Sequence, residues 1–280
     1  MRRIDQPGPA SPDRLMAVPC HGLRFPATLV AGLPLLEAVR RSFAAAGFVS
    51  GVLTLDGLKL DAFAYVMPAL SKTTEHAAFY SETFTPPGIA TVETGRMTFG
   101  ERDGAPFFHA HALWRDGTGA RGGGHILPDG PVIAEEITLD AVGLDGAAFV
   151  AAADPETNFK LFVPQPAKPL GATRQGRFFA LRVKPNVDFA GTLEGFCAEN
   201  GIERAIIHGG VGSTIGASFA DGSVVENFAT EVAITGGRVE AGGSQIDVAL
   251  VDYRGGLAEG HLKRGDNPVL MTFELVLEAP

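Results

Sequence analysis

The sequence predicts an α+β protein of two tandem domains, each a mostly antiparallel β-sheet or partial barrel with one main flanking helix. Three observations predict this class. The chain has 280 residues, about twice the length of an ordinary domain. It contains an internal repeat, and each copy opens with a helical pattern followed only by strand-like segments. Its 36 glycines and 19 prolines indicate many turns, which favours a strand-rich protein over a helical bundle.

Each copy of the repeat begins with a helix. The apolar residues recur at helical spacing, in the first copy at Leu35, Leu36, Val39 and Phe43 and in the second at Phe189, Leu193, Phe196 and Cys197. Each helix is predicted to stop at a glycine, Gly47 or Gly201. A short apolar run follows each helix, over 48–55 and 202–208, and predicts a strand.

Strand-like segments fill the rest of each copy. They are residues 89–99, 107–114 and 131–142 in the first copy, and 246–251 and 269–277 in the second. Turn residues separate them, which is typical of an antiparallel sheet and not of a doubly wound parallel one.

Two landmarks set the domain boundaries. The offset between the copies is 154 residues at Gly47 and Gly201 but 136 at His125 and His261, so the first copy carries about eighteen extra residues. We place this insertion near residues 67–89. Four prolines between the copies indicate a Pro-rich linker over 151–173. We therefore expect a first domain over 15–150 and a second over 174–280.

Charge and composition exclude several classes of protein. Lys and Arg number 23 against 32 Asp and Glu, and the net charge is −9, which matches a nucleic-acid backbone poorly. The two cysteines, Cys20 and Cys197, are too few for a disulfide framework and favour a reducing compartment. Residues 1–14 do not resemble a signal peptide, and no apolar run approaches the length of a membrane helix. We expect a soluble cytoplasmic protein.

One stretch of the first copy resembles a known family. Residues 107–139 read FFHAHALWRDGTGARGGGHILPDGPVIAEEITL, which is similar to the signature of the plants-and-prokaryotes conserved (PPC) domain: His-x-His, an acidic turn, Gly-Gly-His and a strand containing Ala-Glu. The opening helix and GGVGS at 209–213 resemble its N-terminal part. The resemblance implies an antiparallel sheet flanked by helices, usually assembled as trimers, and a fold similar to that of acetolactate decarboxylase.

Three histidines of this stretch form a candidate metal site. His109 and His111 are two residues apart on a predicted strand, so both side chains point to one face. A hairpin after the turn at 116–119 would bring His125 beside them. Three imidazoles match a zinc site with an open position, although they do not by themselves choose among Zn, Fe, Ni and Mn. We expect a divalent metal, zinc first. The alternative is ordinary hydrogen-bonded histidines in a sheet.

The second copy provides an internal control. Counting back from His261 by sixteen and fourteen residues reaches Gln245 and Asp247, so the triad is lost. A repeat that keeps its fold and drops these ligands indicates that the ligands serve function rather than folding. We therefore expect no metal in the second copy.

Two further residues are candidate catalytic groups. Glu135 follows His125 by ten residues and is aligned with Glu274; it is either a fourth ligand or general acid/base, or a structural carboxylate. Arg96 is aligned with Arg238. It either binds a substrate carboxylate or has a structural role, and its presence in both copies favours the structural one.

The insertion supplies a second group of candidates. It carries Glu75, His76, Tyr80 and Glu82. These residues form either a lid that excludes water and supplies an acid or base, for which Glu75 and His76 are the catalytic candidates, or a surface hairpin or oligomer contact.

Three functions remain open at this point. The first is a metal-dependent enzyme, a decarboxylase-like lyase or a hydrolase, or a sensor, acting on a small anionic (carboxylate) molecule. The second is a DNA-associated regulatory protein, as the family name implies, although the chain lacks the Arg-Gly-Arg-Pro element of the plant proteins. The third is a structural oligomer with a vestigial site. We expect self-association, with a trimer favoured by the resemblance, and neither a nucleic-acid nor a membrane partner.

Overall fold

The computed structural model describes residues 1–171 and 176–280. The end of the predicted linker, 172–173, and the first residues of the predicted second domain, 174–175, lie outside the described residues. Two helices and a mostly antiparallel set of strands make up the described chain, so the predicted α+β class is confirmed. None of the described helices is both long enough and apolar enough to cross a membrane.

The first copy forms a six-stranded antiparallel sheet with one helix. Its strands lie in the order β9-β8-β7-β2-β11-β1. The elements are β1 (Leu15–Leu29), α1 (Leu35–Ala45), β2 (Gly51–Thr54), β7 (Ala90–Arg102), β8 (Ala105–Arg115), β9 (Arg121–Ile126) and β11 (Ile137–Asp145). Short strands β3 (Lys59–Asp61), β4 (Tyr65–Val66) and β10 (Val132–Ile133) extend this sheet at β7 and β9.

The second copy repeats this arrangement strand for strand. Its order is β18-β17-β16-β15-β19-β14. The elements are β14 (Arg177–Val183), α2 (Phe189–Glu199), β15 (Arg204–Ser218), β16 (Val224–Glu240), β17 (Gly243–Asp252), β18 (Leu257–His261) and β19 (Val269–Ala279). The two halves therefore share one topology, as the sequence repeat predicts.

Each helix covers one face of its own sheet. Buried side chains of α1 pack on the core of the first copy, and those of α2 on the core of the second. Both helices end where the sequence predicts, because Gly47 and Gly201 adopt positive φ angles of 80° and 62°, which favour glycine. Asp188 caps α2 by accepting a hydrogen bond from the Gly191 amide.

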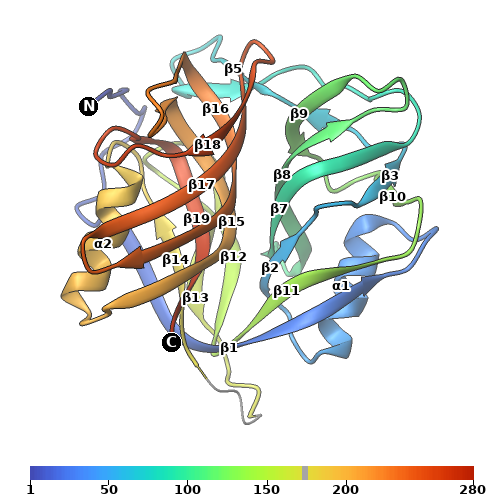
Figure 1. Cartoon of the computed structure of the whole chain (residues 1–280), viewed down its shortest axis with the longest axis horizontal. Helices are drawn as coiled ribbons and strands as arrows, with labels where there is room; N and C mark the ends of the chain where they lie inside the picture. The colour runs from blue at the N-terminus through green and yellow to red at the C-terminus, as the bar shows by residue number, and fades with distance from the viewer. Residues whose placement is uncertain (172–175) are drawn as a thin grey trace.

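The other faces of the two sheets pack against each other, with the helices on the outside (Figure 1). Strand β8 shows this division by its two-residue period. Phe108, Ala110 and Trp114 belong to the core beneath α1, whereas His109 and His111 point toward the second copy. Strand β1 joins the two sheets, since its first half pairs with β14 and its second half with β11.

The predicted linker is largely a β-hairpin. Strands β12 (Ala147–Ala153) and β13 (Lys160–Pro166) pair with each other, and β12 runs parallel to the end of β7. The boundary that we expected at 150 thus falls inside β12. The prolines mislead because Pro155 lies in the hairpin turn, while Pro164 and Pro166 lie in a strand that, among the described strands, pairs only with β12.

The insertion at 67–89 forms a second small hairpin, β5 (Pro68–Leu70) and β6 (Ala78–Tyr80). It packs against the second copy, where Ala78 belongs to a hydrophobic cluster with Ile215, Ala229 and Leu270. Both hairpins therefore lie beside the junction of the two sheets, next to the histidines of β8.

Candidate metal centre

The three predicted histidines converge at the junction of the two copies. His109 and His111 lie on β8, and His125 lies opposite His111 on β9. Their ring centroids are 4.5 Å apart for His109 and His111, 4.9 Å for His109 and His125, and 5.4 Å for His111 and His125. His111 and His125 are buried and His109 is nearly so. The hairpin thus brings His125 to the pair, as the spacing predicts.

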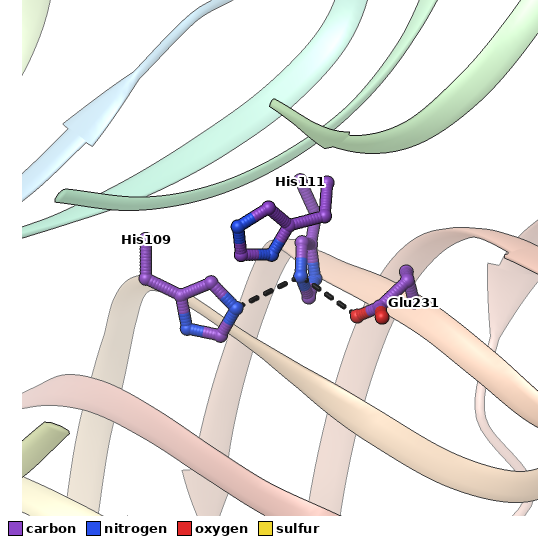
Figure 2. A group of neighbouring side chains, drawn as sticks. His109, His111 and Glu231 are labelled. Carbon is purple, nitrogen blue, oxygen red and sulfur yellow. Dashed lines mark hydrogen bonds and ion pairs between the residues drawn. The ribbon is translucent and has the colours of Figure 1, made fainter. Parts of the chain in front are cut away.

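Two carboxylates of the second copy complete the cluster. Glu231 on β16 places Oε2 2.8 Å from Nε2 of His111 (Figure 2). Glu274 on β19 accepts a hydrogen bond from Nδ1 of His109. Glu231 was not among the residues predicted for the site, because only the packing of the two sheets brings it to the histidines. One ligand atom from each of the three histidines and Glu231 lies within 4.8 Å of the others.

The hydrogen bonds at Nδ1 orient the two imidazoles of β8. Burial raises the pKa of Glu274 to about 8. When Glu274 is ionised, His109 donates to it from Nδ1, and His111 donates from Nδ1 to the carbonyl of Val232, 3.0 Å away. In the neutral rings each Nε2 then carries a lone pair, and the two Nε2 atoms are 2.9 Å apart (Figure 2). Two lone pairs facing a carboxylate at this distance repel one another unless a cation or a proton lies between them.

The unpaired atoms at the site also fit a bound cation. Nδ1 of His125 and Oε2 of Glu274 are buried without a hydrogen-bond partner, which is costly unless another group satisfies them. Imidazole nitrogens and a carboxylate oxygen are the donors of zinc and other transition-metal sites. The outer contacts of His109 and His111 are those that commonly fix a ligating imidazole. The residues present therefore fit a divalent metal.

The electrostatics of the cluster keep two histidines neutral. Burial and the neighbouring His111 lower the pKa of His109 to about 3. Burial, together with His109 and His111, also lowers the pKa of His125. For His111, burial acts to lower the pKa, but Glu231 and the Val232 carbonyl outweigh it and raise the pKa above its ordinary value.

The structure does not place Glu135 in this cluster. Its side chain is 65% exposed and forms an ion pair with Lys59, 2.8 Å away. The alignment of Glu135 with Glu274 is wrong, because the 136-residue offset at His125 and His261 carries Glu274 onto Thr138, which is exposed on the surface. The two acidic residues follow different turns after the shared histidine, and sequence similarity alone misaligned them.

Arg96 holds the two copies together at the edge of the site. It is buried, pairs with Asp56 at 2.8 Å, and donates to the carbonyl of Thr235 in the second copy at 2.5 Å. The strand ladder places Arg96 opposite His111 but Arg238 opposite Gln245, so the two arginines are not equivalent. Both of its contacts are structural, which is the role that the sequence favoured.

The insertion brings an aromatic residue, rather than an acid, to the histidines. The ring of Tyr80 lies 5.3 Å from that of His125. Burial raises the pKa of Tyr80, and the carboxylates Glu231 and Glu274 add to this, so its hydroxyl stays protonated. Glu75 is exposed and contacts Asn158 only through its backbone carbonyl. His76 packs between Phe79 and Phe159, with ring centroids 4.9 and 4.7 Å away.

The equivalent positions of the second copy hold no such cluster. Asp247 lies opposite His261 in the same register as His111 and His125, and the two form an ion pair. Among residues 1–171 and 176–280, the group at His109 is the one cluster whose His, Cys, Asp or Glu side chains lie close enough to hold a metal.

Comparison with known protein families finds one match, and it covers the second copy. Residues 171–279 match the Plants and Prokaryotes Conserved (PCC) domain. We found no curated protein that matches the sequence.

Three solved structures are similar to parts of the chain. A metal-containing protein from Archaeoglobus fulgidus is 19% identical, with a TM-score of 0.38, over 51% of this chain and 94% of its own. A plant- and prokaryote-conserved (PPC) protein from Pyrococcus horikoshii is 16% identical, with a TM-score of 0.40, over 54% and 97%. A Ralstonia eutropha protein described as a candidate DNA-binding protein is 17% identical, with a TM-score of 0.34, over 52% and 96%. The similarity to the PCC domain covers residues 171–279, which form the second copy.

Proposed function

We propose that this protein binds one divalent metal ion through His109, His111 and His125, with Glu231 beside it, and uses the metal to act on or sense a small anionic molecule. The observation that carries the proposal is the convergence of two imidazole Nε2 atoms and a carboxylate oxygen, at 2.8–2.9 Å, in a buried place where both Nδ1 atoms are already engaged. Such a set of lone pairs is stable with a cation in its centre.

The chain's own residues have distinct roles in this proposal. Glu274 and the Val232 carbonyl hold His109 and His111 in the orientation that presents Nε2. Tyr80 covers His125 and limits the access of water. The metal, when bound, would act as a Lewis acid or lower the pKa of a bound water, and a carboxylate is the kind of anion that an open metal position accepts.

The metal's identity follows from how Glu231 is used. With Glu231 as a fourth ligand, tetrahedral zinc would be fully coordinated, as in structural sites. If Glu231 accepts a hydrogen bond from a metal-bound water instead, zinc keeps an open position. Five- or six-coordinate iron, nickel or manganese keeps open positions in either case. We favour zinc with Glu231 facing the open position.

Elemental analysis of the purified protein tests the proposal. We expect about one equivalent of a divalent metal per chain, and retitration of the metal-free protein with zinc should restore that stoichiometry. Metal should be released as the pH falls, because only unprotonated imidazole coordinates. Protein that neither carries nor takes up a divalent metal at neutral pH would refute the proposal.

We do not extend DNA binding to this chain. Acidic residues outnumber basic ones, 32 to 23, and a phosphate backbone is met by clustered Lys and Arg. We therefore expect no band shift with duplex DNA at physiological salt.

Self-association and location in a reducing compartment stay predictions. Cys20 and Cys197 are buried and unpaired, which supports the compartment. The two copies already pack on each other within one chain. This supports an oligomer smaller than a trimer of two-domain chains, which would contain six domains. Light scattering measures the oligomeric state directly.

A further inference from the structure

A groove leads from the surface to the histidines. It has a volume of about 810 Å³, and His109 and His125 line its inner end. Its walls come from the insertion, the β12–β13 hairpin, the turn between β7 and β8, strand β8 itself, and the loop that follows β9. The insertion has no counterpart in the second copy, where β15 and β16 are joined by a short turn. The groove therefore combines elements of the repeated fold with the insertion, at the copy that keeps its histidines.

Aromatic rings dominate the groove. Phe79, His76 and Phe159 pack at 4.7–5.7 Å between ring centroids, and Tyr80 lies 5.9 Å from Phe159 and 5.3 Å from His125. These ring contacts run without a break from Phe79 through Phe159 and Tyr80 to His125. Phe79 is 46% exposed although it is apolar. An exposed phenylalanine beside other rings offers a face on which a flat ligand can stack.

The charged side chains of the groove balance each other. Asp103 pairs with Lys160 at 2.7 Å and lies 3.8 Å from Arg102, and Asp129 is the second acidic residue of the lining. Arg102 also lies 5.1 Å over the ring of Phe107. Two cations against two carboxylates leave no net charge on the walls. The body of a ligand in this groove therefore needs no ionic group, and the one place for an anion is the histidine end.

We propose that the groove binds an aromatic carboxylate, with its ring stacked along Phe79 and Phe159 and its carboxylate directed to the metal held by the histidines. This inference rests on the proposed function for the carboxylate end, whereas the aromatic end stands on the groove alone. The volume of about 810 Å³ is in the range of pockets for small organic ligands and has room for a single or fused ring.

Calorimetric titration of the metal-loaded protein tests the inference with two matched probes, benzoate and cyclohexanecarboxylate. They share charge and size, and they differ in the π-face. An aromatic contact of about 0.5–1.5 kcal/mol predicts that benzoate binds roughly 2- to 12-fold more tightly. Benzyl alcohol, which keeps the ring and loses the charge, should bind more weakly than benzoate.

The variant Phe79→Leu locates the preference. It keeps an apolar side chain at an exposed position and removes the ring, so the ratio of the two affinities should fall toward one. Val224→Ala, an exposed apolar position outside the groove lining, is the matched control and should leave the ratio unchanged. Equal binding of the two acids, or an unchanged ratio in Phe79→Leu, would overturn the inference.

The neutral pair benzyl alcohol and cyclohexylmethanol separates this inference from the metal proposal. In metal-free protein the aromatic alcohol should still bind more tightly. A protein that binds metal but shows no aromatic preference refutes the groove and leaves the metal site standing. A protein that prefers the aromatic alcohol but takes up no metal refutes the proposed function and the carboxylate end of the inference.

Discussion

The two copies of the repeat have the same strand order but differ in the three residues at the position of the histidines. In the first copy β8 and β9 carry His109, His111 and His125, whereas β17 and β18 of the second carry Gln245, Asp247 and His261 in the same register. The sheet forms equally well with either set. The repeated fold therefore forms without these histidines, and the difference between the copies lies at the proposed metal site.

The copies also differ in what faces them. In the packing of the two sheets, β8 of the first copy lies against β16 of the second as well as against β17, its own counterpart. Glu231 and Glu274 of the second copy consequently meet the histidines of the first. Asp247 and His261, by contrast, are 50% and 31% exposed in their side chains. The contact is heterologous, with different surfaces of the two copies meeting.

The largest expected effect separates the two triads. His111→Ala should abolish metal retention, because it removes a central donor, whereas His261→Ala should leave one metal per chain. Elemental analysis of both proteins measures this, with circular dichroism to confirm that each is folded. An unchanged metal content in His111→Ala would show that the metal does not bind at the histidines of the first copy. Unfolding of His111→Ala but not of His261→Ala would show that the metal is needed for folding.

The next effect tests what holds the copies together. Asp154, in the turn of the β12–β13 hairpin, pairs with Arg182 on β14, and each side chain is only 2% exposed. Asp154→Asn leaves the buried guanidinium without its counter-charge and should cost about 3–5 kcal/mol in the free energy of unfolding at neutral pH. Denaturant titration measures it. Asp103→Asn, which breaks an exposed pair with Lys160, should cause no comparable loss.

The same pair gives a pH dependence. Burial acts to raise the pKa of Asp154, but Arg182 outweighs it and holds the pKa below its ordinary value. The stability that comes from the ionised carboxylate is therefore present above the ordinary carboxyl range and is lost as the pH falls through the lowered pKa. The difference between the natural chain and Asp154→Asn should narrow in acid, and a constant difference at all pH values would contradict the assignment.

A smaller effect tests whether Glu274 of the second copy supports metal binding by the histidines of the first. Glu274→Gln weakens the group that orients His109 and should reduce metal affinity about 10- to 100-fold, the usual cost of losing such an outer partner. Glu135→Gln is the control at an exposed carboxylate and should leave the affinity unchanged. Competition with a chromophoric chelator measures both. Equal affinities in the two variants would mean that the second copy does not support the site.

The last prediction is that rebuilding the three histidines in the second copy adds no second metal ion. Gln245→His with Asp247→His rebuilds the triad in the second copy, yet we expect the stoichiometry to stay near one metal per chain. Among the described residues, Asp247 and His261 belong to no cluster that could hold a metal, and their side chains are 50% and 31% exposed. A second equivalent of metal, bound as tightly as the first, would show that three histidines are sufficient and that the facing copy is dispensable.

The sequence by itself predicted the repeat, the class and the histidines. Helical spacing before Gly47 and Gly201, followed by short strands, is local information, and it gave both helices and the order of the copies. The spacing of His109, His111 and His125 predicted their convergence, because a two-residue period and a hairpin turn act within neighbouring strands. The linker was the exception, since prolines in a turn and in a strand paired on one side look the same in sequence as prolines in a linker.

Only the tertiary structure decided what completes the site. Glu231 and Glu274 come from strands more than 100 residues away, and no periodicity connects them with β8. The alignment of the repeat pointed instead to Glu135, because similarity between copies records equivalent positions, whereas the site joins positions that are not equivalent. Which strand of one copy faces which strand of the other depends on how two sheets pack, and that packing is a property of the whole folded chain.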